Sequence, residues 1–312
     1  MNILEIKNLA KKFGDFIAVD NMSLSLAEGE IFGFLGSNGA GKSTTINMIT
    51  GLIRKNQGTI KFLGKDSAKH ATFMKRNIGM VPQEIAIYED LTAYENVHFF
   101  AGLYGFRGKE LHERTLEALK FVGLLEKQKN FPKKFSGGMK RRLNIACALA
   151  HRPKLIIMDE PTVGIDPQSR NYILNSVRKL NDMGCTIIYT SHYMEEVEEI
   201  CSRIAIIDHG KIIAEGTKEQ LKSLITNKKL IEIEVRTTEG INLADIKAIQ
   251  GVADVHCTDN KIQIHTDFGM NNLNHIIAHF IHHGIDIRSL DEKEPNLETV
   301  FLTLTGRNLR DI

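Results

Sequence analysis

The order of apolar and polar positions along the chain predicts strands that alternate with helices. Strands are expected at residues 3–10, 17–26, 31–36, 59–64 and 76–83, from period-two alternation or short apolar runs. A helical pattern occupies residues 43–53, and helices with turn-like breaks extend from about residue 91 to residue 150. The first half of the chain therefore contains both kinds of element.

Three later apolar runs are continuous rather than alternating. They lie at residues 154–161, 186–192 and 203–208. Such runs suit central parallel strands that are buried on both faces. Because these strands alternate with helices, the pattern predicts a doubly wound α/β core.

The pattern changes near residues 225–229 and predicts a small separate unit. Its expected strands and helices are defined by the apolar positions Ile231, Ile233, Val235, Leu243, Ile246, Ile249, Leu273, Ile276, Ile277, Phe280 and Ile281. A hairpin over residues 253–265 and a last strand at 285–290 give the order strand-helix-strand-strand-helix-strand, which is ferredoxin-like. One more short helix is expected at residues 296–304.

These patterns divide the chain into two domains, residues 1–223 and residues 224–312, with a helical subdomain at about 84–150. A length of 312 residues suits two ordinary domains. Apolar residues make up 42% and charged residues 25%, as in soluble globular proteins. The formal net charge of +2 does not indicate a nucleic-acid partner, and we expect none.

Cysteine usage and the N-terminus indicate the compartment. No two cysteines have C-x-x-C spacing, so we expect buried or neutral thiols in a reducing environment; the cysteines are Cys147, Cys185, Cys201 and Cys257. The N-terminus lacks the pattern of a signal peptide, and no window of 18 apolar residues exists. We therefore expect a cytoplasmic chain that neither crosses a membrane nor is secreted.

A glycine-rich loop provides the first candidate chemistry. Residues Gly36 to Ser43 fit the pattern G-x-x-x-x-G-K-[ST] between a predicted strand and a predicted helix. Backbone N–H groups of such a loop surround phosphates, Lys42 adds a positive charge, and the Ser43 hydroxyl is a ligand for Mg²⁺. The residues expected around the phosphates are Gly36, Ser37, Asn38, Gly39, Ala40, Gly41, Lys42, Ser43 and Thr44.

Two carboxylates follow the apolar run at residues 154–161. Asp159 and Glu160 stand at the carboxyl end of a strand, where open α/β sheets bind ligands. Asp159 is expected to hold Mg²⁺, and Glu160 to orient the attacking water or to accept its proton. An acidic pair after a strand is a weak signal by itself, and the phosphate loop strengthens it.

A second glycine turn, Gly137-Gly138, opens a basic helix. Ser136 can cap that helix, and a helix N-terminus of this kind suits an anion. The chain thus has two candidate phosphate sites, about a hundred residues apart. The alternative is a solvated basic helix start.

Six motifs stand in a fixed order: the phosphate loop, VPQ, FSGGM, LIIMDEP, GIDP and TSH. Together they resemble the ATP-binding cassette (ABC) ATPases, the motor subunits of ABC transporters, over about Met1 to Ser223. The resemblance implies a P-loop NTPase with a parallel-sheet core, an antiparallel β subdomain and a helical subdomain. It also implies ATP and Mg²⁺ as ligands.

The resemblance assigns further roles. Phe13 would stack on adenine, Gln83 would contact Mg²⁺ or the attacking water, and His192 would contact the γ-phosphate. Asp166 would couple the two sites of a dimer. Each residue also has an ordinary structural explanation: a core aromatic, a loop amide, a structural histidine and a turn cap.

The resemblance also explains the second phosphate site. Ser136, Gly137 and Gly138 of one subunit would close over the nucleotide held by a second copy, or by a similar ATPase. Two flanking positions depart from the commoner family pattern, since Phe135 replaces Leu and Met139 replaces Gln. The serine and glycines are expected to make the contact.

The resemblance implies a separate transmembrane permease, with this chain at the inner face of the membrane. Residues 84–100 would receive the permease, although their aromatic residues could instead form subdomain core. The C-terminal residues EPNLETVFLTLTG resemble ATPases of bacterial exporters for drugs, polysaccharides, lipids or sodium. That second domain would aid dimerisation or regulation.

Two other functional classes compete with an exporter subunit. A soluble ABC ATPase acting on ribosomes or DNA would carry two cassettes, or a coiled coil or zinc module between Lys42 and Asp159; this chain has neither pattern. A non-hydrolytic cassette is disfavoured by the presence of Glu160 and His192.

Four histidines share one predicted helix face in the second domain, at His275, His279, His282 and His283. Histidines four residues apart can share a metal. No carboxylate lies beside them on that face, so a solvated polar face is the favoured interpretation.

Overall fold

A computed structural model describes residues 1–225, 228–238, 241–267, 270–293 and 296–306. The chain divides into two compact units, Met1–Lys218 and Glu219–Arg307, close to the predicted boundary at residues 223 and 224. None of the described helices is both long and apolar enough to cross a membrane.

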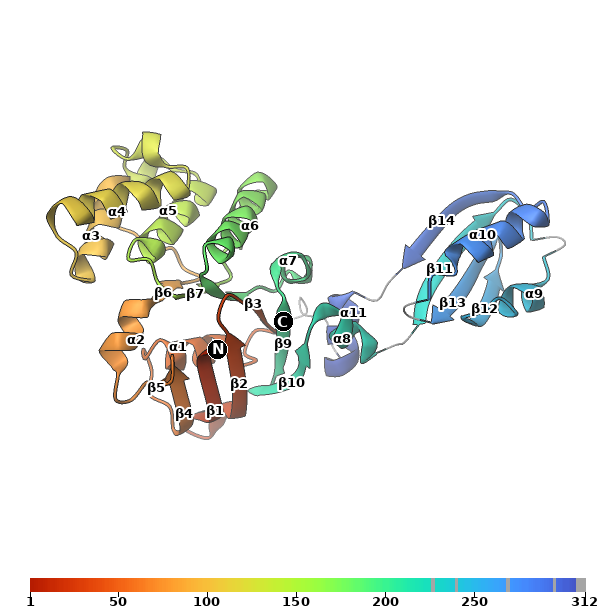
Figure 1. The fold of residues 1–312 in the computed structure, drawn as a ribbon, viewed down its shortest axis with the longest axis horizontal. Helices are drawn as coiled ribbons and strands as arrows, with labels where there is room; N and C mark the ends of the chain where they lie inside the picture. The colour runs from red at the N-terminus through yellow and green to blue at the C-terminus, as the bar shows by residue number, and fades with distance from the viewer. Residues whose placement is uncertain (226–227, 239–240, 268–269, 294–295, 307–312) are drawn as a thin grey trace. The chain divides into compact units, whose positions relative to one another are not determined.

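A six-stranded sheet forms the centre of the first unit (Figure 1). In spatial order its strands are β10 (Lys211–Gly216), β9 (Arg203–Asp208), β3 (Ile31–Gly36), β8 (Thr186–Thr190), β7 (Leu155–Asp159) and β6 (Ile78–Val81). All neighbours pair in parallel except β10, which forms an antiparallel hairpin with β9. Every residue of β3, β7 and β8 is buried, as their continuous apolar sequences predicted.

An antiparallel sheet packs against the N-terminal part of this core. It consists of β2 (Phe16–Ala27), β1 (Asn2–Phe13), β4 (Gln57–Phe62) and β5 (Lys65–Asp66). The helix α1 (Lys42–Ile49) follows β3, and its Ile46 and Ile49 share a buried cluster with Leu24 of β2 and Phe34 of β3. This packing holds the start of α1 at the carboxyl end of the parallel strands.

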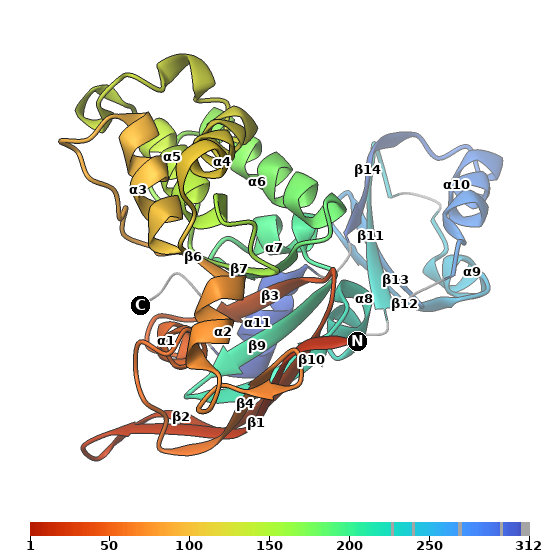
Figure 2. The same cartoon turned by 60° about the vertical axis from the view of Figure 1, so that its left-hand side comes forward.

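Three helices form the predicted helical subdomain: α3 (Ala93–Leu103), α4 (Gly108–Phe121) and α5 (Gly137–Leu149). Two short 3₁₀ turns, Leu125–Lys127 and Pro132–Lys134, connect α4 to α5. In both views the six-stranded sheet lies between this helical group and the antiparallel sheet (Figure 1, Figure 2). Three more helices, for which the sequence pattern made no specific prediction, are α2 (Ala71–Asn77), α6 (Pro167–Asp182) and α7 (Met194–Ile200).

The second unit has the predicted ferredoxin-like order. Its elements are α8 (Lys218–Ser223), β11 (Lys228–Val235), α9 (Leu243–Lys247), β12 (Val252–Thr258), β13 (Lys261–Asp267), α10 (Leu273–His282), β14 (Ile287–Lys293) and α11 (Leu297–Thr305). The antiparallel sheet has the order β12-β13-β11-β14. Ile276 and Phe280 of α10 are buried in its core, whereas Ile281 is 68% exposed. Helix α9 ends before Ile249, which the apolar spacing had included.

The histidines of α10 and its C-terminal end lie close to one another. The rings of His279 and His283 are 4.2 Å apart, and Nδ1 of His283 bonds to the backbone oxygen of His279 at 2.8 Å. Nowhere in the described part of the chain do three His, Cys, Asp or Glu side chains gather as metal ligands. The solvated polar face stays a prediction.

A buried histidine after α5 makes the first unit sensitive to acid. The ring of His151 stacks on Tyr104 at 3.6 Å and contacts the Ile78 carbonyl at 3.2 Å. Burial lowers the pKa of His151 to about 4 from 6.5, so its contribution is intact above pH 6.5 and is lost as the pH falls toward 4. We expect roughly 3 kcal/mol of unfolding free energy to be lost over that interval, measurable by urea titration. The His151→Phe variant keeps the stacking and should lose less over the same interval; parallel pH profiles would contradict the prediction.

Candidate functional site

The phosphate loop connects β3 to α1, and its backbone requires glycine. Gly39 and Gly41 have positive φ angles of 77° and 105°. A Cβ atom at Gly41 would lie 2.5 Å from the Ala18 carbonyl oxygen, so a side chain there would collide with the neighbouring backbone. The loop thus keeps the tight course that brings its N–H groups together.

Lys42 is buried at the first position of α1. Its Nζ donates to the carbonyl oxygens of Gly36 at 2.6 Å and Ser37 at 3.1 Å. Burial lowers the pKa of Lys42, and the nearby carboxylates of Glu160 and Asp159 oppose that change. A charged ammonium with two acidic neighbours is thereby held inside the loop.

Oxygen atoms suited to a divalent cation meet beside the loop. The Ser43 hydroxyl lies 3.4 Å from Asp159 Oδ2, and the Thr190 hydroxyl donates to Asp159 Oδ1 at 2.6 Å. A hydroxyl and a carboxylate are hard oxygen ligands of the kind that Mg²⁺ prefers. The residues present therefore fit the predicted ion.

Glu160 stands at the junction of three segments that are distant in the sequence. Its Oε2 accepts a hydrogen bond from Gln83 Nε2 at 3.2 Å and lies 3.2 Å from His192 Nδ1. The bond to His192 lowers the pKa of Glu160, so the side chain is a carboxylate at neutral pH. Its φ angle of +46° is unusual for a residue other than glycine, and its N–H donates to the Thr190 hydroxyl at 2.9 Å.

A cavity of about 160 Å³ collects most of these predicted residues. It is lined by Phe16, Ala18, Ser37, Asn38, Gly39, Gly41, Lys42, Ser43, Thr44, Gln83 and Glu160. Phe16 was missed by the sequence analysis, and Phe13 does not line this cavity. Phe13 is 49% exposed, and the Nζ of Lys11 lies 4.7 Å from the centre of its ring. The role of Phe13 toward adenine stays a prediction.

The residues of the second phosphate site do not line that cavity. Ser136 caps α5, accepting from the Met139 N–H at 3.3 Å, and Asp166 caps α6, accepting from the Ser169 N–H at 2.9 Å. The two helix starts touch, because a Cβ atom at Gly138 would lie 2.0 Å from Ser169 Oγ. By contrast, a Cβ atom at Gly137 would meet nothing within 4 Å.

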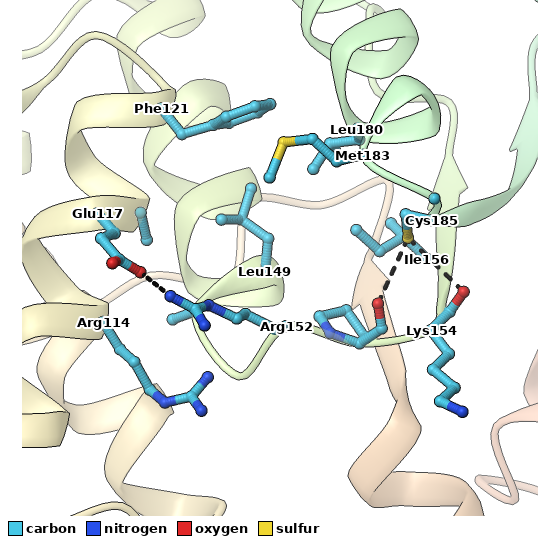
Figure 3. Close-up of a pocket in the computed structure, with 14 residues that line it drawn as sticks. Arg114, Glu117, Phe121, Leu149, Arg152, Lys154, Ile156, Leu180, Met183 and Cys185 are labelled. Atoms are coloured by element: carbon cyan, nitrogen blue, oxygen red, sulfur yellow. Dashed lines mark hydrogen bonds and ion pairs between the residues drawn. The ribbon is translucent and has the colours of Figure 1, made fainter.

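A larger cavity of about 540 Å³ lies elsewhere in the first unit and contains none of the predicted site residues (Figure 3). Apolar side chains from α4, α5 and α6 line it, and an ion pair between Arg152 and Glu117, at 2.5 Å, stands at one side. Cys185 also lines this cavity, and its Sγ donates a hydrogen bond to the Pro153 carbonyl oxygen at 3.5 Å. Burial raises the pKa of Cys185 to about 12, so the group is a thiol and not a reactive thiolate.

The fold and the site define a class of protein. A glycine loop between a parallel strand and a helix, with Asp159 and Glu160 at the end of β7, which is separated from β3 by β8 in the same sheet, is the arrangement of a P-loop nucleoside triphosphatase. The added antiparallel sheet and helical subdomain are those expected for the ABC type.

Comparison with known proteins identifies the family. Residues 19–163 match the ABC transporter family, and residues 216–305 match the C-terminal domain described as ATP-binding protein DrrA1-3-like. The chain is 49% identical, over 99% of its length and 100% of the relative's, to the linearmycin resistance ATP-binding protein LnrL of Bacillus subtilis. It is 33% identical to the daunorubicin/doxorubicin resistance ATP-binding protein DrrA of Streptomyces peucetius, covering 99% of this chain and 94% of that one.

Solved structures agree with this result. The ATP-binding subunit of an ABC transporter superposes with a TM-score of 0.65 at 30% identity, over 72% of this chain and 93% of that one. A dimeric cassette bound to ADP and Pi superposes with a TM-score of 0.63 at 30% identity, over 69% and 98% of the two chains. The chain belongs to the ATP-binding subunits of ABC transporters, and it is an ATPase; the transporter hypothesis is confirmed over the ribosome and DNA alternative.

Proposed function

We propose that this chain powers an exporter by closing as a dimer on ATP and opening after hydrolysis. The observation that carries the proposal is the meeting of Lys42, Asp159, Glu160 and His192 around one phosphate loop. These residues come from three separate segments, and together they supply a cation, metal ligands and a base.

Each side chain has a distinct task in hydrolysis. Lys42 would neutralise charge on the outer phosphates, and Ser43, Asp159 and Gln83 would hold Mg²⁺, which would supply further positive charge to the phosphate oxygens. Glu160 would accept the proton of the attacking water, and His192, whose Nδ1 lies 3.2 Å from Glu160 Oε2, would contact the γ-phosphate. Phe13 stacks on the adenine.

The second phosphate site acts on the partner's nucleotide. Ser136, Gly137 and Gly138 would contact the γ-phosphate bound by the other subunit, which can be a second copy or a similar ATPase. Two features support this: these residues lie outside the chain's own phosphate cavity, and a similar cassette has been solved as a dimer. Asp166 would couple the two sites, because its helix touches the helix that Ser136 caps.

An apolar groove in the first unit is suited to the permease. The groove has a volume of about 630 Å³, and its rim includes Leu52 and Leu103, which are 69% and 66% exposed. Phe100 lines it, and Lys75 and Arg76 add two positive charges. We propose that a short amphipathic helix of the permease, apolar on one side and acidic on the other, occupies this groove. That contact would hold the chain at the cytoplasmic face of the membrane.

Export is the direction of transport that the relatives favour. Two of them are named for drug resistance, and another, from Sinorhizobium fredii, is a Nod factor export ATP-binding protein with 36% identity over 99% of this chain and 87% of its own. We therefore propose a drug-like or similar small amphiphilic cargo that the permease selects.

The groove provides the experimental test. The chain is co-expressed with a candidate permease, a membrane protein sought among the products of neighbouring genes, and Leu103→Asp is expected to abolish co-purification while retaining nucleotide binding. The reason is that a buried unpaired carboxylate would cost several kcal/mol at the contact. Met183→Asp is the matched control, because Met183 is 74% exposed in the same unit but lines the other cavity. Equal recovery of the permease with both variants would refute the proposed docking.

A further inference from the structure

A buried carboxylate on α7 joins segments that surround the candidate site. Glu196 is 1% exposed. Its Oε2 accepts hydrogen bonds from three hydroxyls, those of Thr162 at 2.7 Å, Tyr189 at 2.8 Å and Ser191 at 2.9 Å. Its Oε1 lies 3.0 Å from Arg170 Nε. The four partners come from three parts of the chain: the turn after β7, the end of β8 with the residue that follows it, and α6.

Three of these partners stand beside predicted site residues. Thr162 is two positions after Glu160 in the turn that leaves β7. Ser191 directly precedes His192. Arg170 belongs to α6, the helix that Asp166 caps. One carboxylate thus contacts the segments that present the base, the γ-phosphate ligand and the dimer-coupling residue.

The contacts also define the course of the chain around His192. The Ser191 hydroxyl donates to Glu196 and accepts from the Tyr193 N–H at 2.9 Å, which forms a tight turn across His192. The Arg170 guanidinium lies 4.5 Å from the centre of the Tyr193 ring, and that ring is 4.3 Å from the His192 ring. The His192 imidazole therefore lies against a Tyr193 ring that is itself in contact with Arg170.

Burying a carboxylate here has no advantage for stability alone. A buried ion pair is often replaceable by apolar residues at no loss of stability, because desolvation offsets the attraction. A buried hydrogen-bond network does, however, fix the relative positions of the groups that it joins, and here Oε2 accepts three hydrogen bonds while Oε1 meets Arg170 as an ion pair without a hydrogen bond. The arrangement around Glu196 fits that second purpose.

We infer that Glu196 is a positioning residue for ATP hydrolysis. It fixes the positions of Glu160 and His192 relative to each other and to the segment of Asp166. The inference rests on the roles proposed above for Glu160 and His192. It adds a residue that touches neither nucleotide nor water and acts through Thr162 and Ser191.

The test replaces Glu196 with glutamine in the full-length chain. The amide keeps the size of the side chain but cannot accept hydrogen bonds at its nitrogen, so part of the network is lost. We expect kcat for ATP hydrolysis to fall about 10- to 100-fold, as for small misplacements of reacting groups, with KM for ATP unchanged. Glu199→Gln is the matched control: it lies on the same helix and loses an exposed ion pair with Arg178 at 2.5 Å, and its kcat should equal that of wild type.

Other outcomes decide against the inference. A wild-type kcat in Glu196→Gln overturns it, and so does a fall in kcat that only matches the loss of folded protein measured by circular dichroism, because unfolding removes active enzyme without changing KM. If Glu196→Gln does not fold, Ser191→Ala takes its place and must lower kcat alone; if kcat stays at the wild-type level, the inference fails. Glu160→Gln is measured in parallel, because an active Glu160→Gln would overturn the proposed roles rather than the positioning by Glu196.

Discussion

Replacing Glu160 with glutamine is expected to lower kcat for ATP hydrolysis by about 100- to 10,000-fold, the usual contribution of a general base. The structure gives the reason. The Glu160 carboxylate has a lowered pKa beside His192 and is oriented by the Gln83 amide at 3.2 Å, so it is ready to take a proton at neutral pH. Glutamine has nearly the same shape and cannot take that proton. ATP binding should survive, because the contacts of Lys42 with its loop do not involve this side chain.

The same variant tests the dimer. With ATP and Mg²⁺ present, Glu160→Gln should accumulate as a dimer in size-exclusion chromatography with light scattering, because closure occurs and opening does not. The wild-type chain under turnover should return to monomer with ADP. Glu195→Gln, an exposed charge change on α7, is the control and should behave as wild type. A Glu160→Gln chain that stays monomeric with ATP, or that hydrolyses it at the wild-type rate, would refute the sandwich.

The phosphate loop could be predicted from the sequence because its groups are contiguous. Gly36 to Ser43 form the loop with backbone atoms and one lysine, so local spacing already contains the chemistry. The meeting of Gln83, Glu160 and His192 is different, because these residues are 77 and 32 positions apart. Only the resemblance to a family predicted it, since periodicity does not tell which strand ends are neighbours.

Features that depend on tertiary packing escaped the sequence analysis. Phe16 lines the phosphate cavity because the turn after β1 brings it there, and no local pattern distinguishes it from Phe13. Glu196 is flanked by charged residues and looks like part of a solvated helix face. Its burial depends on Arg170 of α6 and on the hydroxyls of Thr162, Tyr189 and Ser191, which only the fold brings together on one carboxylate.

The second unit likewise has features that the sequence predicted and one that it did not. Alternating apolar residues predicted the strands, and the order of elements predicted the ferredoxin-like arrangement that the structure has. The exposure of Ile281 could not be predicted, because the apolar stripe of α10 is wider than the face that the sheet covers.

The second large effect is expected at Gly138, where α5 meets α6. Alanine favours helix over glycine, yet its Cβ atom would lie 2.0 Å from Ser169 Oγ and 2.5 Å from Ser169 Cβ. Such overpacking should cost about 1–3 kcal/mol of unfolding free energy, more than the gain in helix propensity. Because the clash displaces the start of the helix that Ser136 caps, hydrolysis should also be lost. Urea unfolding and ATPase assays measure the two effects.

Two companion variants separate packing from contact with the partner's nucleotide. The double variant Gly138→Ala with Ser169→Gly removes both clashing atoms and should recover the stability that Gly138→Ala loses. Ser169→Gly is also measured alone, so that its own loss of helix propensity can be subtracted. Gly137→Ala meets no atom within 4 Å in the free chain, so its stability should equal or slightly exceed that of wild type. In the sandwich, however, this added methyl group would face the phosphate bound by the other subunit, and hydrolysis should fall without any loss of stability. A fully active Gly137→Ala chain would mean that the second glycine turn only packs helices and does not contact a nucleotide.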